Sequence, residues 1–135
     1  MQTTPATPFE RFGGHEFFDL LIARFYAGVA EDPQLRPMYP EADLGPAAER
    51  LQLFLEQYWG GPTTYSELRG HPRLRMRHQP FPVDAAAHDA WLRHMRVALD
   101  EAAPAVGMAD EDQAELWDYL SRAAFSMVNT YPAPD

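Results

Sequence analysis

The stretch FFDLLIARFYAGV, residues 17–29, decides the fold class of this chain. Its apolar side chains recur at three- and four-residue spacing, which predicts an α-helix. They are Phe17, Leu21, Phe25 and Val29, and Phe18, Ile22 and Tyr26 form a second row beside them on the helix. Gly13 and Gly14 stand just ahead of this pattern, where we expect them to break the helix or to let another backbone come close.

The chain's 13 prolines leave four long windows without proline, and these windows are where long helices can form. The first covers residues 9–32, and the second covers 47–59 and ends at Gly-Gly-Pro. The third opens with Asp84 as an expected N-cap, and the fourth begins near Asp110. No stretch alternates with a period of two for long enough to form a strand. The sequence therefore predicts an all-α fold with four main helices.

Composition limits the class of protein. A length of 135 residues fits a single domain, which we place at residues 11–130, with 1–10 as a disordered Thr/Pro-rich tail. The absence of cysteine excludes disulfides, iron–sulfur clusters and thiolate zinc sites. We find no signal peptide and no membrane-spanning stretch, so we expect a cytoplasmic protein that is not integral to a membrane.

The charges are distributed unevenly. The formal net charge of −9 argues against nucleic acid as a partner. All eleven cationic side chains are arginines, and four of them lie within nine residues. These four are Arg69, Arg73, Arg75 and Arg77. They fall in a weakly periodic stretch, 62–82, that we expect to be a long functional loop. Such a strip indicates a bound anion, although a solvated loop face is the simpler alternative.

Histidine narrows the choice of anion. His78 closes the arginine strip, and one histidine beside several guanidinium groups suits a flat, anionic metal cofactor such as haem. His88 and His94 are six residues apart on one helix and therefore cannot hold the same metal ion. Glu56 is expected to point to solvent, and no pair of carboxylates is placed for hydrolysis.

Several motifs together resemble the group II truncated haemoglobins, from about residue 12 to residue 129. The most specific of them is GHPRLRMRH at 70–78, followed by the pair Trp91-Leu92. The others are FY at 25–26, MYP at 38–40, FLEQYWGGP at 54–62, Tyr65, and PF at 80–81.

The resemblance implies a two-over-two helical sandwich around haem b. It implies His78 as the proximal iron ligand and Tyr26, Tyr39 and Trp91 as polar residues on the distal side. Ala47 matches the position at which many globins carry a distal histidine. Arg50 and Arg77 resemble residues that reach the haem propionates. The full set of implied cofactor contacts is Ala47, Arg50, Leu51, Phe54, Leu55, Tyr65, His71, Arg75, Met76, Arg77 and Trp91.

The function expected from this set is binding of O₂, and of CO and NO, with slow release of O₂. Each hydrogen bond to a charged group contributes about 1.5–3 kcal/mol, so two or three distal donors would retain bound O₂. The alternative is a redox enzyme that acts on NO or peroxide with an external reductase. A more remote alternative is a cofactor-free helical module whose arginines dock an acidic partner. Either a monomer or a homodimer fits the sequence.

Overall fold

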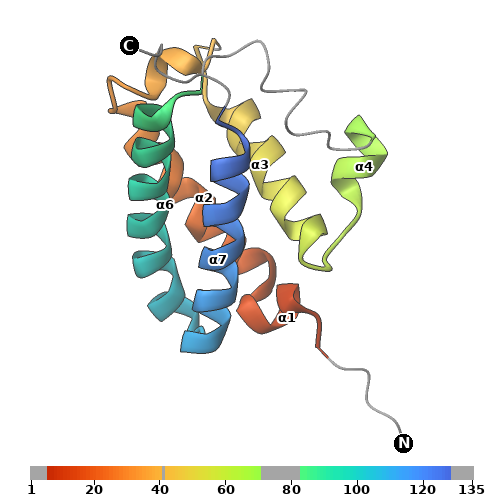
Figure 1. Cartoon of the computed structure of the whole chain (residues 1–135). Helices are drawn as coiled ribbons and strands as arrows, with labels where there is room; N and C mark the ends of the chain where they lie inside the picture. Colours follow the sequence, from red (N-terminus) through yellow and green to blue (C-terminus); the bar gives the residue numbers. More distant parts are fainter. Residues whose placement is uncertain (1–5, 41, 71–82, 129–135) are drawn as a thin grey trace, which may run out of the picture.

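The computed structural model describes residues 6–40, 42–70 and 83–128, and all the regular structure in these ranges is helical (Figure 1). This confirms the predicted all-α class. The four main helices follow the four predicted windows. They are α2 (Gly14–Ala30), α3 (Gly45–Tyr58), α6 (Ala85–Val106) and α7 (Asp110–Ser126). Three short elements accompany them: α1 (Pro8–Phe12), the 3₁₀ turn η1 (Arg36–Met38) and α4 (Thr64–Arg69).

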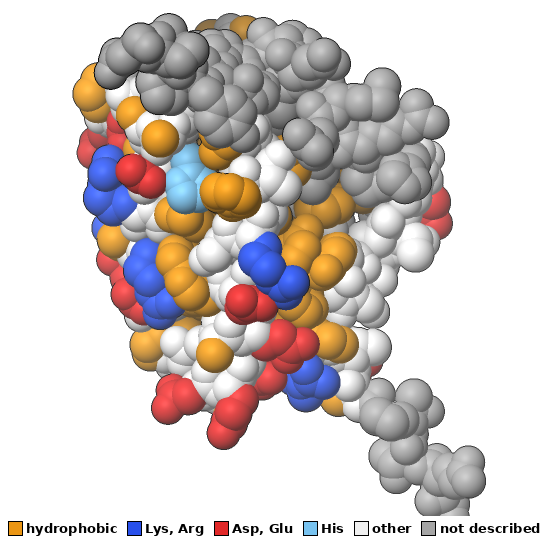
Figure 2. Space-filling view, viewed as in Figure 1, with side chains coloured by type: hydrophobic (Ala, Val, Ile, Leu, Met, Phe, Trp, Pro, Cys, Tyr) orange, Lys and Arg blue, Asp and Glu red, His pale blue; other side chains and the backbone are white. Residues whose placement is uncertain are grey.

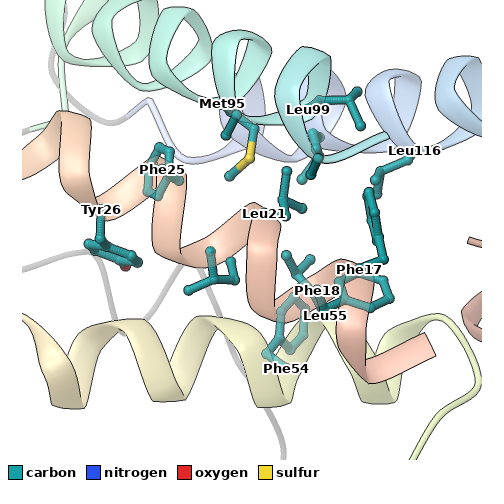
Figure 3. Close-up of a cluster of buried hydrophobic side chains, with 14 of the residues drawn as sticks. Phe17, Phe18, Leu21, Phe25, Tyr26, Phe54, Leu55, Met95, Leu99 and Leu116 are labelled. Carbon is teal, nitrogen blue, oxygen red and sulfur yellow. The ribbon is translucent and has the colours of Figure 1, made fainter. Parts of the chain in front are cut away.

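Helix α2 forms the centre of the molecule and lies between α6 and α3 (Figure 3). Both rows of apolar residues predicted from its sequence are buried, because the helix contacts neighbours on more than one side. Helix α6 meets it with small side chains, including Ala98 and Ala102, which allow close packing around Met95 and Leu99. Each large apolar side chain buried here contributes about 1.5–3 kcal/mol.

The four main helices form two pairs. Helices α6 and α7 run antiparallel, joined by a turn in which Gly107 adopts the left-handed conformation (Figure 1). Helices α2 and α3 form the second pair, and α2 makes the most extensive contact between the two pairs, with α6. The arrangement confirms the predicted two-over-two sandwich.

The amino-terminal boundary differs from the sequence prediction. The Thr7 hydroxyl accepts a hydrogen bond from the Glu10 backbone N–H at 3.2 Å and so caps α1. Residues 8–10, which we had assigned to a disordered tail, are therefore helical. The predicted break follows at Gly13, whose φ of 120° suits glycine. A Cβ at Gly13 would lie 2.9 Å from the Cβ of Phe17, so the tight turn has no room for a side chain at this position.

Two other element boundaries depart from the sequence expectation. Helix α6 continues through Pro104 for two further residues, because a proline near a helix end disrupts only the last turn. Residues 64–69, placed in a structureless loop, form α4, which is too short to show helical periodicity. The Gln57 side chain holds α4 in place by accepting from the Ser66 backbone N–H at 2.9 Å and donating to its hydroxyl at 2.6 Å.

Glu56 was expected to point to solvent, and this expectation is wrong. Its side chain is only 5% exposed, and both carboxylate oxygens lie 3.1 Å from Nδ1 of His15 in the first turn of α2. The Gln52 amide also approaches this ring nitrogen, at 3.3 Å. Glu56 therefore joins α3 to the start of α2, where the positive end of the helix dipole favours a carboxylate.

Acidic side chains gather at the end of the molecule where α7 begins (Figure 2). The first turn of α7 carries Asp110, Glu111 and Asp112, which suit a helix N-terminus. Arg11 of α1 approaches Asp112 at 3.4 Å and Glu115 at 3.2 Å, and so ties α1 to α7. Each helix in the described ranges is too short or too polar to cross a bilayer.

Candidate functional site

A cavity of about 490 Å³ opens between the two helix pairs. This volume lies within the range of small-molecule and cofactor sites, about 300–1,000 Å³. Helices α2, α3, α4, α6 and α7 and the segment around η1 all contribute to its walls. The lining includes every predicted site residue within the described ranges: Tyr26, Tyr39, Ala47, Arg50, Leu51, Phe54, Leu55, Tyr65 and Trp91.

Helix α3 supplies one apolar wall. Ala47, Leu51, Phe54 and Leu55 follow each other at steps of four, three and one residues, so they share one face of the helix. All four line the cavity, and Phe54 packs edge-to-face on Tyr65 of α4 with ring centroids 5.6 Å apart. These four side chains are all apolar, which makes their face of α3 suitable for a flat apolar ligand.

Three polar aromatic residues of the cavity lining lie near one another and are linked through the ring of Phe25. Trp91 of α6 packs edge-to-face on Phe25, with centroids 5.2 Å apart, and Phe25 packs in the same way on Tyr26 at 4.9 Å. Tyr26 in turn meets Tyr39 edge-to-face at 5.8 Å. The structure thus brings together the three side chains that sequence reasoning assigned to the distal side, from three separate elements.

The phenol of Tyr39 stays protonated at neutral pH. Burial raises the pKa of Tyr39 above its usual value of 10.0, although a hydrogen bond with Tyr26 and the charge of Arg50 oppose this rise. The Tyr26 hydroxyl also lies 3.5 Å from the carbonyl oxygen of Ala47, a long hydrogen bond. Protonated phenols can donate hydrogen bonds, so this part of the cavity is suited to a ligand that carries partial negative charge.

A buried carboxylate holds the segment that carries Tyr39. Asp32 follows α2 and is only 6% exposed, and its Oδ2 lies 2.5 Å from Nε2 of His94. Its Oδ1 accepts hydrogen bonds from the backbone N–H groups of Gln34 and Leu35 at 2.7 and 3.2 Å. The hydrogen bond with His94 lowers the pKa of Asp32, against the opposing effect of burial.

Arg36 continues this support along the same segment. Its guanidinium donates to the carbonyl oxygens of Tyr39 and Ala42 at 3.0 and 2.9 Å. The path of the backbone from α2 to α3 is therefore fixed on both sides of Tyr39.

Two arginines line the cavity beside Tyr65. Arg50 of α3 is half-buried, whereas Arg69, the last residue of α4, is exposed. Both also line a smaller cavity of about 240 Å³ between α3 and α4. The sequence predicted Arg50 as a propionate contact, whereas it gave Arg69 only as a member of the arginine strip. The cavity thus has cationic groups from two helices.

The rest of the predicted set lies outside the described residues. These positions are the expected iron ligand His78 and its neighbours His71, Arg75, Met76 and Arg77. Their roles therefore remain predictions from the sequence.

Sequence reasoning missed part of the lining. His88 of α6 lines the cavity with a side chain 19% exposed, and its Nδ1 lies 3.0 Å from an oxygen of Asp89. Tyr119 of α7 lines it too, together with Leu120 and Met127. The helical spacing of the α7 residues was visible in the sequence, but the cavity that they face was not, because it depends on how α7 packs.

These walls fit haem. The α3 face can cover a flat apolar ring, and Arg50 and Arg69 can meet carboxylates at its edge. The phenols of Tyr26 and Tyr39 and the indole of Trp91 lie where a small polar ligand could be held. An apolar slot with cations and a few convergent donors is the chemistry that haem requires.

Comparison with known proteins agrees with this assignment. The family model "Bacterial-like globin" matches residues 7–129. The group 2 truncated haemoglobin YjbI of Bacillus subtilis is 41% identical over 128 residues, which cover 95% of this chain and 92% of that protein. The crystal structure of a thermostable haemoglobin from Thermobifida fusca matches with a TM-score of 0.88 at 58% identity, covering 93% of this chain and 98% of that one. A structure described as a truncated oxygen-avid haemoglobin from Bacillus subtilis matches with a TM-score of 0.83 at 40% identity, covering 92% and 100%. The chain therefore belongs to the bacterial-like globin family and, within it, to the group II truncated haemoglobins, whose cofactor is haem b.

Proposed function

We propose that this chain binds O₂, and also CO and NO, on a haem held by His78, and that it releases O₂ slowly. The observation that carries the proposal is that Tyr26, Tyr39 and Trp91 line one cavity and are linked through the ring of Phe25. The similarity to a haemoglobin described as oxygen-avid supports slow release. Slow release suits redox chemistry, scavenging or sensing better than bulk oxygen delivery.

When bound, haem would supply an iron that can take a diatomic gas as a ligand. His78 is the candidate ligand because it closes the block that most resembles the family. Arg50 and Arg69, which line the cavity, would neutralise the propionates, and Arg75 and Arg77 are further candidates from the sequence.

The polar residues act on the ligand through hydrogen bonds. Each donor to a charged group contributes about 1.5–3 kcal/mol, which corresponds to roughly a 10- to 150-fold change in an equilibrium constant. Burial keeps the Tyr39 phenol protonated and therefore able to donate. The apolar side chains of α3 exclude water that would otherwise compete for the donors. Removing one donor should therefore speed O₂ release.

Stopped-flow measurement of O₂ dissociation tests this proposal. We expect Trp91→Phe and Tyr26→Phe each to speed release about tenfold or more, since each loses one charge-assisted hydrogen bond. Trp117→Phe is the matched control. Trp117 of α7 packs under the guanidinium of Arg96 of α6 and is not among the residues that line the cavity. The donor argument fails if neither distal change speeds release more than about twofold, or if the control has the same effect.

The second candidate is redox chemistry on NO or peroxide with electrons from an external reductase. It is favoured by the same donors, which would polarise an O–O bond, and by the oxidisable rings of Trp91 and Tyr119 in the lining. Turnover of NO or peroxide with a reductant distinguishes the two functions. A rate no higher than that of free haem would leave gas binding alone.

A further inference from the structure

A histidine of helix α6 reaches across to the residue that follows α2. Nε2 of His94 lies 2.5 Å from Oδ2 of Asp32, whose side chain is only 6% exposed. Trp91, which lines the cavity, stands three residues before His94 on the same helix. We propose that His94 is a positioning residue of the gas-binding site, which acts through Asp32 to hold the Tyr39 hydroxyl in place for O₂. This inference rests on the proposed binding of O₂ to a haem in the cavity.

The connection from Asp32 to Tyr39 is continuous. Oδ1 of Asp32 accepts hydrogen bonds from the backbone N–H groups of Gln34 and Leu35. The carbonyl oxygen of Asp32 accepts from the N–H of Arg36 at 2.9 Å. Arg36 begins the 3₁₀ turn η1, and its own carbonyl oxygen accepts from the N–H of Tyr39 at 3.1 Å. A shift of the Asp32 carboxylate would therefore move the backbone that carries Tyr39.

The His94 ring is itself fixed by close packing. A Cβ at Gly28 of α2 would clash with Nδ1 of His94, so the ring rests directly on the α2 backbone. Arg93 approaches the same carboxylate oxygen of Asp32 at 3.4 Å, but its side chain is 63% exposed, and such exposed pairs contribute little. His94 is therefore the side chain that contributes most to holding the Asp32 carboxylate.

A positioned hydroxyl should discriminate between gases. O₂ gains negative charge when it binds iron and then accepts hydrogen bonds well, whereas CO gains little charge. A displaced Tyr39 hydroxyl should therefore speed the release of O₂ and leave the release of CO nearly unchanged. A general loosening of the cavity would instead speed the release of both gases.

The test measures O₂ and CO dissociation by stopped flow on haem-loaded protein. His94→Ala removes the contact with Asp32 and should speed O₂ release several-fold. The upper limit is the effect of Tyr39→Phe, which we expect to be about tenfold or more because this change removes the donor itself. His94→Gln keeps an amide N–H that can donate to Asp32, so it should restore much of the slow release. CO release should change little in each variant.

A double variant and a matched control separate positioning from loss of stability. In the Tyr39→Phe background, His94→Ala should bring no further increase in O₂ release, because both changes act through one hydroxyl. His15→Ala is the control, since His15 also pairs with a buried carboxylate, that of Glu56, but at the opposite end of α2. This control should lower the unfolding midpoint and leave O₂ release unchanged.

The infrared spectrum of the CO complex gives a readout that does not depend on rates. A hydrogen-bond donor near the oxygen of bound CO lowers the C–O stretching frequency. His94→Ala and Tyr39→Phe should therefore both raise this frequency, whereas His15→Ala should leave it unchanged.

Three results would overturn the proposal and leave the proposed function standing. They are unchanged O₂ release in His94→Ala, an equal effect of this change on O₂ and CO, and an undiminished effect in the Tyr39→Phe background. A haem-loaded protein in which neither Tyr39→Phe nor Trp91→Phe speeds O₂ release would instead contradict the proposed function. If His94→Ala does not fold, Asp32→Asn takes its place, because it keeps the size of the side chain but weakens the contact with His94, and the same results decide.

Discussion

Replacing Asp32 by alanine should destabilise the protein strongly, because its carboxylate contacts His94, two backbone N–H groups and, at 3.4 Å, the guanidinium of Arg93. The ring of His94 lies 2.5 Å from one oxygen, and two backbone N–H groups donate to the other at 2.7 and 3.2 Å. Loss of the charge-assisted bond costs about 1.5–3 kcal/mol, and loss of the cap-like bonds costs about 0.5–2 kcal/mol. At about 4 °C per kcal/mol for a domain of this size, the sum of about 2–5 kcal/mol lowers the unfolding midpoint by roughly 8–20 °C.

Urea and thermal unfolding followed by circular dichroism measure this change. Asp100→Ala is the control, because Asp100 is 57% exposed and pairs with Arg96 on its own helix, and such a pair contributes about 1 kcal/mol or less. The Asp32→Ala variant should also release O₂ faster, since the carboxylate fixes the turn that leads to Tyr39. An Asp32→Ala cost no larger than that of Asp100→Ala would refute the reasoning.

The stability that Asp32 contributes should depend on pH. The pKa of Asp32 in the folded protein lies below its usual value of 3.8, chiefly because of the hydrogen bond with His94. Ionised Asp32 therefore contributes stability above about pH 4, and this contribution is lost as the pH falls through the folded-state pKa. The difference in unfolding free energy between wild type and Asp32→Asn should accordingly shrink on acidification below about pH 4. A difference that stays constant would contradict the assignment.

Three further predictions use the same kinds of measurement. Gly28→Ala should cost about 1–3 kcal/mol, because a Cβ would lie 2.4 Å from Nδ1 of His94, and a stabilised variant would disprove the close contact. Glu56→Ala should cost about 1–3 kcal/mol in urea unfolding, since it removes the buried partner of His15, and a neutral result would be inconsistent with that role. The difference in tyrosinate absorbance between wild type and Tyr119→Phe should titrate near pH 12, because burial raises the pKa of this phenol to about 12. A midpoint near pH 10 would mean that Tyr119 is not buried.

Most of the fold could be predicted from the sequence, because the four main helices are long and strongly periodic. The two apolar rows that begin at Phe17 and Phe18 predicted helix α2. Asp84 was correctly predicted to cap the start of α6, where its carboxylate accepts from the N–H of Ala87. The errors fall where tertiary contacts override local signals. Glu56 is buried because α2 brings His15 to it, and residues 64–69 are helical because Gln57 and the burial of Tyr65 support a single short helix.

The residues of the candidate site could be predicted only where they belong to a recognisable sequence motif. Tyr26, Tyr39 and Trp91 were identified through the family motifs, and all three line the cavity. His88 and Tyr119 were missed because nothing local distinguishes a helix face that lines a cavity from one that lines the core. Contacts between helices decide that difference, and a single sequence does not contain them explicitly.

The most direct test of the central claim is the absorption spectrum of the haem-loaded protein and of His78→Gly, each with and without added imidazole. We predict an intense Soret band in the wild type, a weakened or shifted band in the variant, and recovery of the wild-type spectrum when imidazole replaces the missing ligand. A variant spectrum identical to that of the wild type would contradict ligation by His78. A wild-type protein that stays folded and colourless after haem is added would contradict the account as a whole.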